Sequence, residues 1–394
     1  MTDITTDNTE VRWSRVIPVV LGGVVSHAFG RSTLQTLLPA IADEIGLGPQ
    51  VEGYLGTTGF GCYFLGVIIV TFVAAKLDPF TLLRGGIAII AVGLAVLTFA
   101  SSAWMLFVGV GLTGLGGPGV WLTMPALVAA SAPPARRGAV MGSLTATMGV
   151  AFIVVPAATI LMRRLADDNG VWRPVWLIGV VFSLGLLLYL SVFFERPDVP
   201  SETRSVGMKP LFALSMWKPA VTTYMAFAFI ASSYGLFLGR MLEDDSGFGR
   251  TFTTMMFTVM GFGSIAGALG FGRLSDRLGR PRVMMIVLWL MAVALVGLTA
   301  DNTALVVGSV LLVGSCSASI PSLIATYTRD QSGDQNFTAV FGAMTIFYGP
   351  ATMLGPFVGG QLGNSAGSFT SFYVLLAAMS LVASFSAWRL SHNR

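Results

Sequence analysis

The sequence predicts an all-α membrane protein with twelve transmembrane helices in two pseudo-symmetric six-helix halves. Composition sets the class, because 54% of the 394 residues are hydrophobic and only 11% are charged, with a mean hydropathy of +0.77. Soluble globular proteins carry about 25% charged residues. Apolar runs of about 20 residues, long enough to cross a bilayer, recur along the chain. The second half also repeats a pattern found in the first.

The twelve predicted spans are residues 16–41, 53–75, 81–100, 104–130, 138–162, 174–194, 218–240, 251–272, 283–300, 303–327, 337–361 and 370–388. Residues 1–15 then form an N-terminal cytoplasmic tail, and 16–194 form the first six-helix half. Residues 195–217 form a polar cytoplasmic linker, 218–388 the second half, and 389–394 a C-terminal tail. The N-terminal tail lacks the basic-then-apolar order of a cleaved signal peptide.

An internal repeat relates the two halves at an offset near 200 residues. Three residues of the fifth span recur in the eleventh: Gly142, Gly149 and Pro156 match Gly342, Gly349 and Pro356. Duplicated halves around a central site are typical of secondary transporters.

Basic residues gather on one side of the predicted bundle. Of the 23 Lys and Arg residues, 17 fall on the side of the two termini, five on the opposite side, and Arg31 within a span. Because cytoplasmic loops are enriched in Lys and Arg, both termini are predicted to be cytoplasmic. The expected location is the bacterial inner membrane. Cys62 and Cys316 lie in apolar runs, so no disulfide framework is expected.

Arg31 lies near the middle of the first predicted span, where a charge is costly. A cation at that depth costs at least ~2.5–3.5 kcal/mol, so it normally faces a partner or a water-filled cavity. His27 precedes it by one helical turn and shares its face, and Gln35 is placed with them in the candidate substrate site. The alternative is that Arg31 bonds backbone carbonyls of a broken helix and that His27 is simply packed.

The acidic residues support an anionic substrate. All 19 Asp and Glu fall in tails, loops or span ends, so no buried carboxylate is expected. An anion would then offset the desolvation of Arg31. Other candidates for the cavity wall are Trp121, Tyr224, Tyr234, Ser317 and Tyr348, with helix packing or an aromatic belt as the alternative for each. Tyr348 precedes Gly349-Pro350, where an interruption of the helix is expected.

The most specific motif is Gly272–Arg282, with the sequence GRLSDRLGRPR, in the predicted loop between spans eight and nine. Glycine permits a tight turn there, and Asp276 can pair with an arginine or cap a helix. The motif resembles the loop signature of the major facilitator superfamily. Its first-half copy, residues 74–84, keeps only Asp78 and Arg84. The segments HAFGR at 27–31 and LLP at 37–39 resemble the YbfB/YjiJ-type bacterial branch of that superfamily.

This resemblance implies the superfamily's twelve-helix fold and a latch that holds the cytoplasmic side closed. The matching latch positions are Gly272, Asp276, Arg277, Gly279, Arg280, Asp78 and Arg84. Many proton-coupled relatives carry an arginine in span four where this chain has Val110, so coupling schemes that need that arginine do not carry over.

The predicted function is secondary active uptake of small organic anions, such as monocarboxylates, by alternating access with proton coupling. The proton would be carried by His27 or bound together with the anion. The alternative is multidrug or metabolite efflux, for which the 19 methionines would supply an adaptable apolar cavity. A monomer is expected. No motif for catalysis, metal, cofactor or nucleic acid is found, which leaves a polytopic enzyme or receptor as the weaker rival.

Overall fold

The computed structural model describes residues 11–74, 76–133, 136–165, 171–194 and 208–392. Parts of the predicted tails and linker, residues 1–10, 195–207 and 393–394, lie outside this range. The described chain is helical and contains no strand. Within it, eleven helices are long and apolar enough to cross a membrane. The remaining span of the twelve is the first, residues 13–45, which the structure divides into three helical segments.

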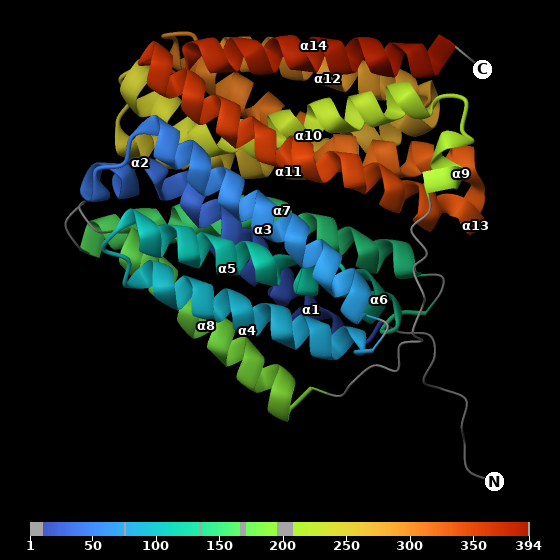
Figure 1. The fold of residues 1–394 in the computed structure, drawn as a ribbon, viewed down its shortest axis with the longest axis horizontal. Helices are drawn as coiled ribbons and strands as arrows, with labels where there is room; N and C mark the ends of the chain where they lie inside the picture. Colours follow the sequence, from blue (N-terminus) through green and yellow to red (C-terminus); the bar gives the residue numbers. More distant parts are fainter. Residues whose placement is uncertain (1–10, 75, 134–135, 166–170, 195–207, 393–394) are drawn as a thin grey trace.

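Figure 1 shows the two halves as two layers. The N-terminal half comprises α1 (Trp13–Val24), η1 (Val25–Ser32), α2 (Thr33–Ile45), α3 (Pro49–Val73), α4 (Pro79–Thr98), α5 (Ala103–Trp121), α6 (Met124–Ala129), α7 (Arg137–Leu165) and α8 (Trp172–Val192). The short helix α9 (Met208–Phe212) falls within the predicted linker. The C-terminal half comprises α10 (Trp217–Arg240), η3 (Met241–Asp245), α11 (Arg250–Leu278), α12 (Arg280–Gly297), α13 (Thr303–Ala366) and α14 (Thr370–His392).

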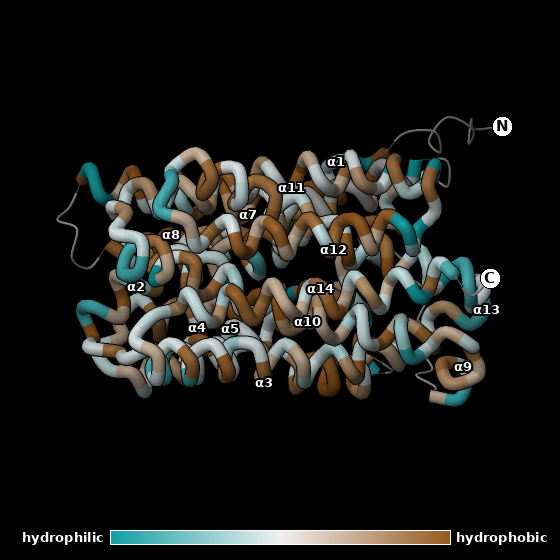
Figure 2. The backbone as a smooth tube through the Cα atoms, turned by 90° about the horizontal axis from the view of Figure 1, so that it is seen from above, coloured by the Kyte–Doolittle hydropathy of each residue, from teal (hydrophilic) through white to brown (hydrophobic). Residues whose placement is uncertain are grey.

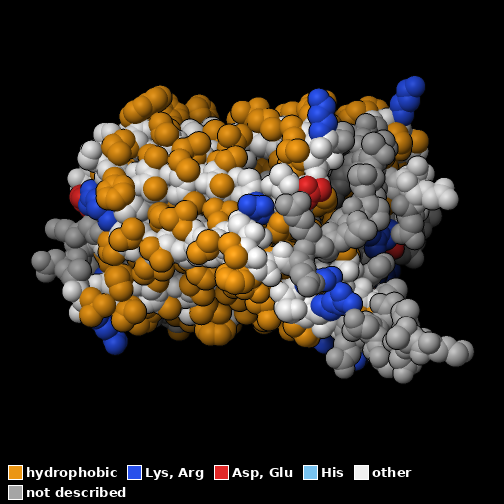
Figure 3. All heavy atoms as spheres, turned by 90° about the horizontal axis from the view of Figure 1, so that it is seen from below, with side chains coloured by type: hydrophobic (Ala, Val, Ile, Leu, Met, Phe, Trp, Pro, Cys, Tyr) orange, Lys and Arg blue, Asp and Glu red, His pale blue; other side chains and the backbone are white. Residues whose placement is uncertain are grey.

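Helix α1 begins and helix α14 ends at the same end of the bundle (Figure 1). We call this the terminal end, and we call the opposite end, which carries the α2–α3 and η3–α11 turns, the distal end. Hydrophilic residues concentrate towards the two ends, and hydrophobic residues dominate between them (Figure 2). On the face shown in Figure 3, apolar side chains cover most of the surface between the ends. This band is the surface expected to face lipid.

The helix boundaries differ from the prediction in the first, fourth, tenth and eleventh spans. The first span contains a π-helical segment, η1, between α1 and α2. The fourth is divided into α5 and α6 shortly after Pro118. The tenth and eleventh spans join in α13, whose only non-helical residue is Gly333, with φ 70° and ψ 161°. Glycine tolerates this positive φ, so the chain reverses there without a longer loop.

The predicted loop at Gly272–Arg282 is wrong, because this segment is almost entirely helical. Helix α11 continues to Leu278 and α12 begins at Arg280, so Gly279 alone separates them, with φ 86°. Pro281 lies in the first turn of α12, where proline is tolerated because its missing N–H has no helical acceptor.

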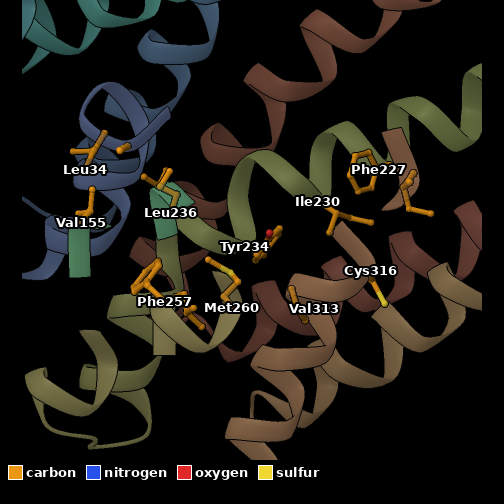
Figure 4. Close-up of a cluster of buried hydrophobic side chains, with 14 of the residues drawn as sticks. Leu34, Val155, Phe227, Ile230, Tyr234, Leu236, Phe257, Met260, Val313 and Cys316 are labelled. Atoms are coloured by element: carbon orange, nitrogen blue, oxygen red, sulfur yellow. The ribbon is translucent and has the colours of Figure 1, made fainter. Parts of the chain in front are cut away.

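Close backbone contacts join the two halves near the distal end. Helix α3 packs against α13, α2 against α10, and α7 against α11. A Cβ atom added at Gly53 would lie 2.6 Å from the carbonyl oxygen of Pro356 and 2.8 Å from Cα of Gly360, so these helices touch through their backbones. Figure 4 shows buried apolar side chains from both halves gathered around α10, including Leu34 and Phe257. The distal side is therefore closed in this conformation.

Candidate substrate site

A small cavity lies beside the first span and contains the residues on which the functional prediction depends. Its volume is about 50 Å³. Each water needs at least about 10–15 Å³ on the same measure, so the cavity has room for a few waters. Most of the wall comes from the N-terminal half, with Leu236 of α10 contributed by the other half. The wall includes His27, Arg31, Gln35, Gly56, Gly59, Phe60, Tyr63, Val110 and Thr113.

The π-helical segment η1 positions two of these side chains. The N–H of Thr33 bonds the carbonyl oxygen of Ala28, five residues earlier, and the Thr33 hydroxyl donates to the same oxygen at 3.0 Å. A π-type turn widens the helix and is often found at functional sites. His27 and Arg31 lie in this widened segment, and Gln35 follows one turn later in α2. The structure thus brings all three predicted residues of the first span to one cavity.

The Arg31 guanidinium lies over two aromatic rings of α3. Its Cζ atom is 4.6 Å from the centre of the Phe60 ring and 5.3 Å from that of Tyr63. Such contacts contribute about 0.5–2 kcal/mol each. Across the described residues, Arg31 has no carboxylate or hydrogen-bond partner, so bonding to backbone carbonyls is not observed there. These ring contacts use no N–H donor of Arg31, so the donors remain for a ligand.

His27 and Gln35 have different environments. The imidazole of His27 packs against the indole of Trp121, at the end of α5, with ring centres 4.6 Å apart. Gln35 is 6% exposed, and its Oε1 atom has no hydrogen-bond partner among the described residues. An oxygen buried in this way is an acceptor that a ligand or a water could satisfy.

The predicted residues of the C-terminal half divide into two pairs. Tyr224 and Tyr348 pack against each other with ring centres 4.4 Å apart, and Tyr348 lies within electrostatic range of Arg31. Tyr234 is buried in the apolar interior (Figure 4). Its carbonyl oxygen accepts a hydrogen bond from the Tyr373 hydroxyl. Ser317 has a buried hydroxyl that lies beside the hydroxyl of Tyr234. None of these four lines the cavity around Arg31.

The expected interruption at Gly349-Pro350 is also wrong, because α13 remains helical through both residues. A Cβ atom at Gly349 would lie 2.3 Å from the ring of Phe64 on α3. The glycine therefore makes room for an aromatic ring of the other half and does not break the helix.

The predicted latch residues lie at the terminal end. Asp276 pairs with Arg280, whose Nη1 also donates to the Ser275 hydroxyl at 2.8 Å and whose Nε lies 3.8 Å from Asp330 of α13. Arg277 is exposed, Gly272 lies within α11, and Gly279 forms the turn.

The first-half copy of this motif is built differently. Asp78 caps α4 by accepting the N–H groups of Phe80 and Thr81, both at 3.0 Å. Arg84 lies inside α4 and packs over the Phe80 ring, with Cζ 5.8 Å from its centre. Arg84 therefore lies within the predicted third span, residues 81–100, and not in the turn that precedes it.

One prediction about acidic residues is overturned at the distal end. Glu52, in the first turn of α3, is completely buried and accepts two hydrogen bonds from Arg240 of α10. The sequence places Glu52 at a span end, as expected, but burial comes from contact between the halves. The sequence contains one hint: Arg240, at the distal end of the predicted seventh span, is a basic residue that needs a counter-ion.

Comparisons with known proteins agree with the fold. The family model described as "Uncharacterised MFS-type transporter YbfB" matches residues 24–388. The chain is 25% identical to the multidrug resistance protein MdtG of Rahnella sp. (strain Y9602), over 76% of this chain and 74% of that protein. It is 23% identical to the putative transporter AraJ of Escherichia coli (strain K12), over 94% and 93% of the two chains.

Among solved structures, the fold resembles a bacterial homologue of the human lysosomal transporter Spinster in an inward-facing and occupied conformation. The TM-score is 0.79 at 12% identity, over 98% of this chain and 97% of that chain. The family model covers nearly the whole chain, and the fold and the relatives are those of transporters. The chain therefore belongs to the YbfB-type family of the major facilitator superfamily, as a multi-pass membrane transporter and not an enzyme.

Proposed function

We propose that this transporter takes up small organic anions of the monocarboxylate type together with protons, by alternating access. In this proposal the terminal end faces the cytoplasm and the distal end faces outside. Arg31 binds the substrate carboxylate, and His27 and Gln35 complete the polar wall of the site. Tyr348 and Tyr224 meet the substrate from the other half when the cavity widens towards them.

The observation that carries the proposal is the Arg31 guanidinium, which lines a cavity and has no acidic partner among the described residues. Two ring contacts at about 0.5–2 kcal/mol each stabilise a charge at this depth but supply no counter-charge and no hydrogen-bond acceptor. A bound carboxylate supplies the missing counter-charge and two parallel hydrogen bonds. A lipophilic cation would be repelled at the same point.

The size of the cavity favours a small substrate. At about 50 Å³ it is far below the roughly 300–1,000 Å³ of pockets that hold drug-sized molecules. Val110 lies in its wall, so the span-four position that is arginine in many proton-coupled relatives is apolar here. The positive charge of this site is supplied from the first span instead.

Efflux of drugs or metabolites is the second candidate. It is favoured by the name of the relative from Rahnella, a multidrug resistance protein at 25% identity. The physical basis would be an apolar, methionine-rich interior that adapts to several substrates.

Purified protein in proteoliposomes separates the two candidates. We expect radiolabelled small monocarboxylates to accumulate when the outside is acidified, and Arg31→Ala to abolish this accumulation. Extrusion of lipophilic dyes from cells, without saturable carboxylate uptake in proteoliposomes, would instead establish efflux.

A further inference from the structure

A cluster of charged side chains closes the distal end between the two halves. Arg240 of α10 lies at its centre and bonds three carboxylates. Its Nε and Nη2 atoms donate to Oε1 of Glu52 at 2.9 and 2.8 Å, and its Nη1 atom donates to Asp43 at 3.3 Å and Asp244 at 2.9 Å. Glu52 and Asp43 belong to the N-terminal half, so these bonds link the halves across the interface.

Glu52 differs from the other two carboxylates in burial. Its side chain has no exposed surface, whereas those of Asp43 and Asp244 are 47% and 50% exposed. Both Arg240 bonds end on Oε1, and the Oε2 atom of Glu52 is buried without a partner among the described residues. A carboxylate oxygen in this position lacks both water and a donor, which penalises the charged form and favours a proton on that oxygen.

None of the described charged groups around Glu52 donates a hydrogen bond to Oε2. These groups are Asp43 of α2, Arg240 of α10 and Asp244 of η3. Arg250 of α11 bonds Asp43 at 2.6 Å and lies 3.7 Å from Glu243. The distal part of α13, residues 350–366, contains no titratable residue, and Tyr54 on α3 itself is bonded to Gln50 and Gln361.

The position of Glu52 also connects the distal closure with the candidate substrate site. Leu55 and Gly56, which line the cavity, follow it on α3 by about one helical turn. Gly53, the next residue, forms the backbone contact with α13. Separation of α3 from α13 would therefore expose Glu52 to water on the distal side, and contact between them buries it.

We propose that Glu52 is a proton-binding site of this transporter, and that a proton on its Oε2 atom stabilises closure of the distal end. The proposal deepens the proton-coupled uptake proposed above and rests on it. The proton comes from water on the distal side while the halves are apart. Closure buries the neutral acid, and Arg240 keeps Asp43 and Asp244 as counter-ions. The proton later leaves through the cavity to the terminal side.

The sign of the pH effect follows from this linkage. Burying the neutral acid costs less free energy than burying a carboxylate that has one oxygen without a hydrogen-bond donor. The closed conformation therefore binds the proton more tightly than the open one. Acidification therefore shifts the population towards distal closure. Glu52→Gln, which imitates the protonated side chain, is expected to be closed at every pH.

Distances between spin labels test the proposal without any substrate. Labels on Ser102→Cys and Ser365→Cys, both exposed at the distal end, report the separation of the halves after Cys62 and Cys316 are replaced by alanine. In the labelled protein with the charged cluster intact, the short distance between the labels should dominate at pH 5, and the population at the long distance should increase at pH 8. Glu52→Gln should remove this shift, and the matched control Asp244→Asn, which takes an exposed acceptor from the same arginine, should keep it. A shift that persists in Glu52→Gln overturns the proposal.

Two further measurements keep the test decisive. If Glu52→Gln does not fold, the shift is measured in Asp43→Asn, Glu243→Gln and Asp244→Asn; persistence in all three supports Glu52, and loss in any one overturns the proposal.

In proteoliposomes, one coupled proton allows at most about tenfold accumulation per pH unit. Glu52→Gln should reduce accumulation to equilibrium and retain exchange. Arg31→Ala should lose uptake but keep the pH-dependent distance shift, so failure of the anion proposal is distinguishable from failure of this one.

Discussion

The Arg31 guanidinium lies 4.6 Å from the centre of the Phe60 ring, and this contact joins the first span to α3 at the wall of the cavity. The ring stabilises the charge without using its N–H donors. The donors of this cation therefore remain available to the proposed anionic substrate.

The first prediction concerns substitutions of Arg31. Arg31→Ala should abolish carboxylate uptake, because hydrogen bonds to a charged group are worth about 1.5–3 kcal/mol each. Arg31→Lys should retain part of it, since lysine keeps the charge and loses the bidentate fork. Initial uptake rates over a range of substrate concentrations provide the measurement. Equal uptake by Arg31→Ala and the unaltered protein would show that Arg31 does not bind the substrate.

The second prediction concerns His27. His27→Gln keeps a hydrogen-bonding side chain that cannot titrate, so substrate affinity should fall only modestly and pH-driven accumulation should persist. Accumulation and counterflow exchange are measured side by side in proteoliposomes. Loss of accumulation with exchange intact would show that His27, and not Glu52, binds the coupled proton.

The third prediction tests the backbone contact that closes the distal end. Gly53→Ala would place a methyl group 2.6 Å from the Pro356 carbonyl oxygen, and overpacking of this kind costs about 1–3 kcal/mol. The closed conformation should lose stability by that amount, seen as a larger long-distance population between the distal spin labels. Gly85→Ala, where an added methyl meets nothing within 4 Å, is the control and should leave the distances unchanged.

The fourth prediction concerns the pair formed by Asp276 and Arg280. Asp276 is 67% exposed, and exposed ion pairs contribute only about 0.2–1 kcal/mol. Asp276→Asn should therefore reduce turnover by at most about fivefold and leave substrate binding unchanged. A turnover equal to that of the unaltered protein would show that this pair does not act as a latch.

The fifth prediction fixes the orientation. In a protein without its native cysteines, Ser102→Cys at the distal end should react with an impermeant maleimide added to intact cells. His392→Cys at the terminal end should react only after the membrane is opened. The reverse pattern would place both termini outside.

The sequence was sufficient for the helices, the repeat and the charged residue in the first span, because each depends on local composition or spacing. It did not reveal the π-helical segment, since Val25–Ser32 contains no residue that requires a wider turn. It also failed to identify Phe60 and Tyr63 as partners of Arg31, although Gly56, Gly59, Phe60 and Tyr63 follow helical spacing on one face of α3. Burial of Glu52 depends on contact between halves about 190 residues apart in sequence (Arg240 to Glu52), which local patterns do not report.

The π-helical segment has a consequence for how this site can change in evolution. In a regular α-helix each residue advances the side-chain direction by about 100°, so a single inserted or deleted residue rotates everything beyond it. A π-type turn absorbs one extra residue locally and leaves the helices on either side in register with their neighbours. Deleting one residue within Val25–Ser32 would thus straighten the helix and turn His27 and Arg31 out of phase with Gln35. The proposed anion site therefore depends on the phase of the first helix as much as on the identity of its residues.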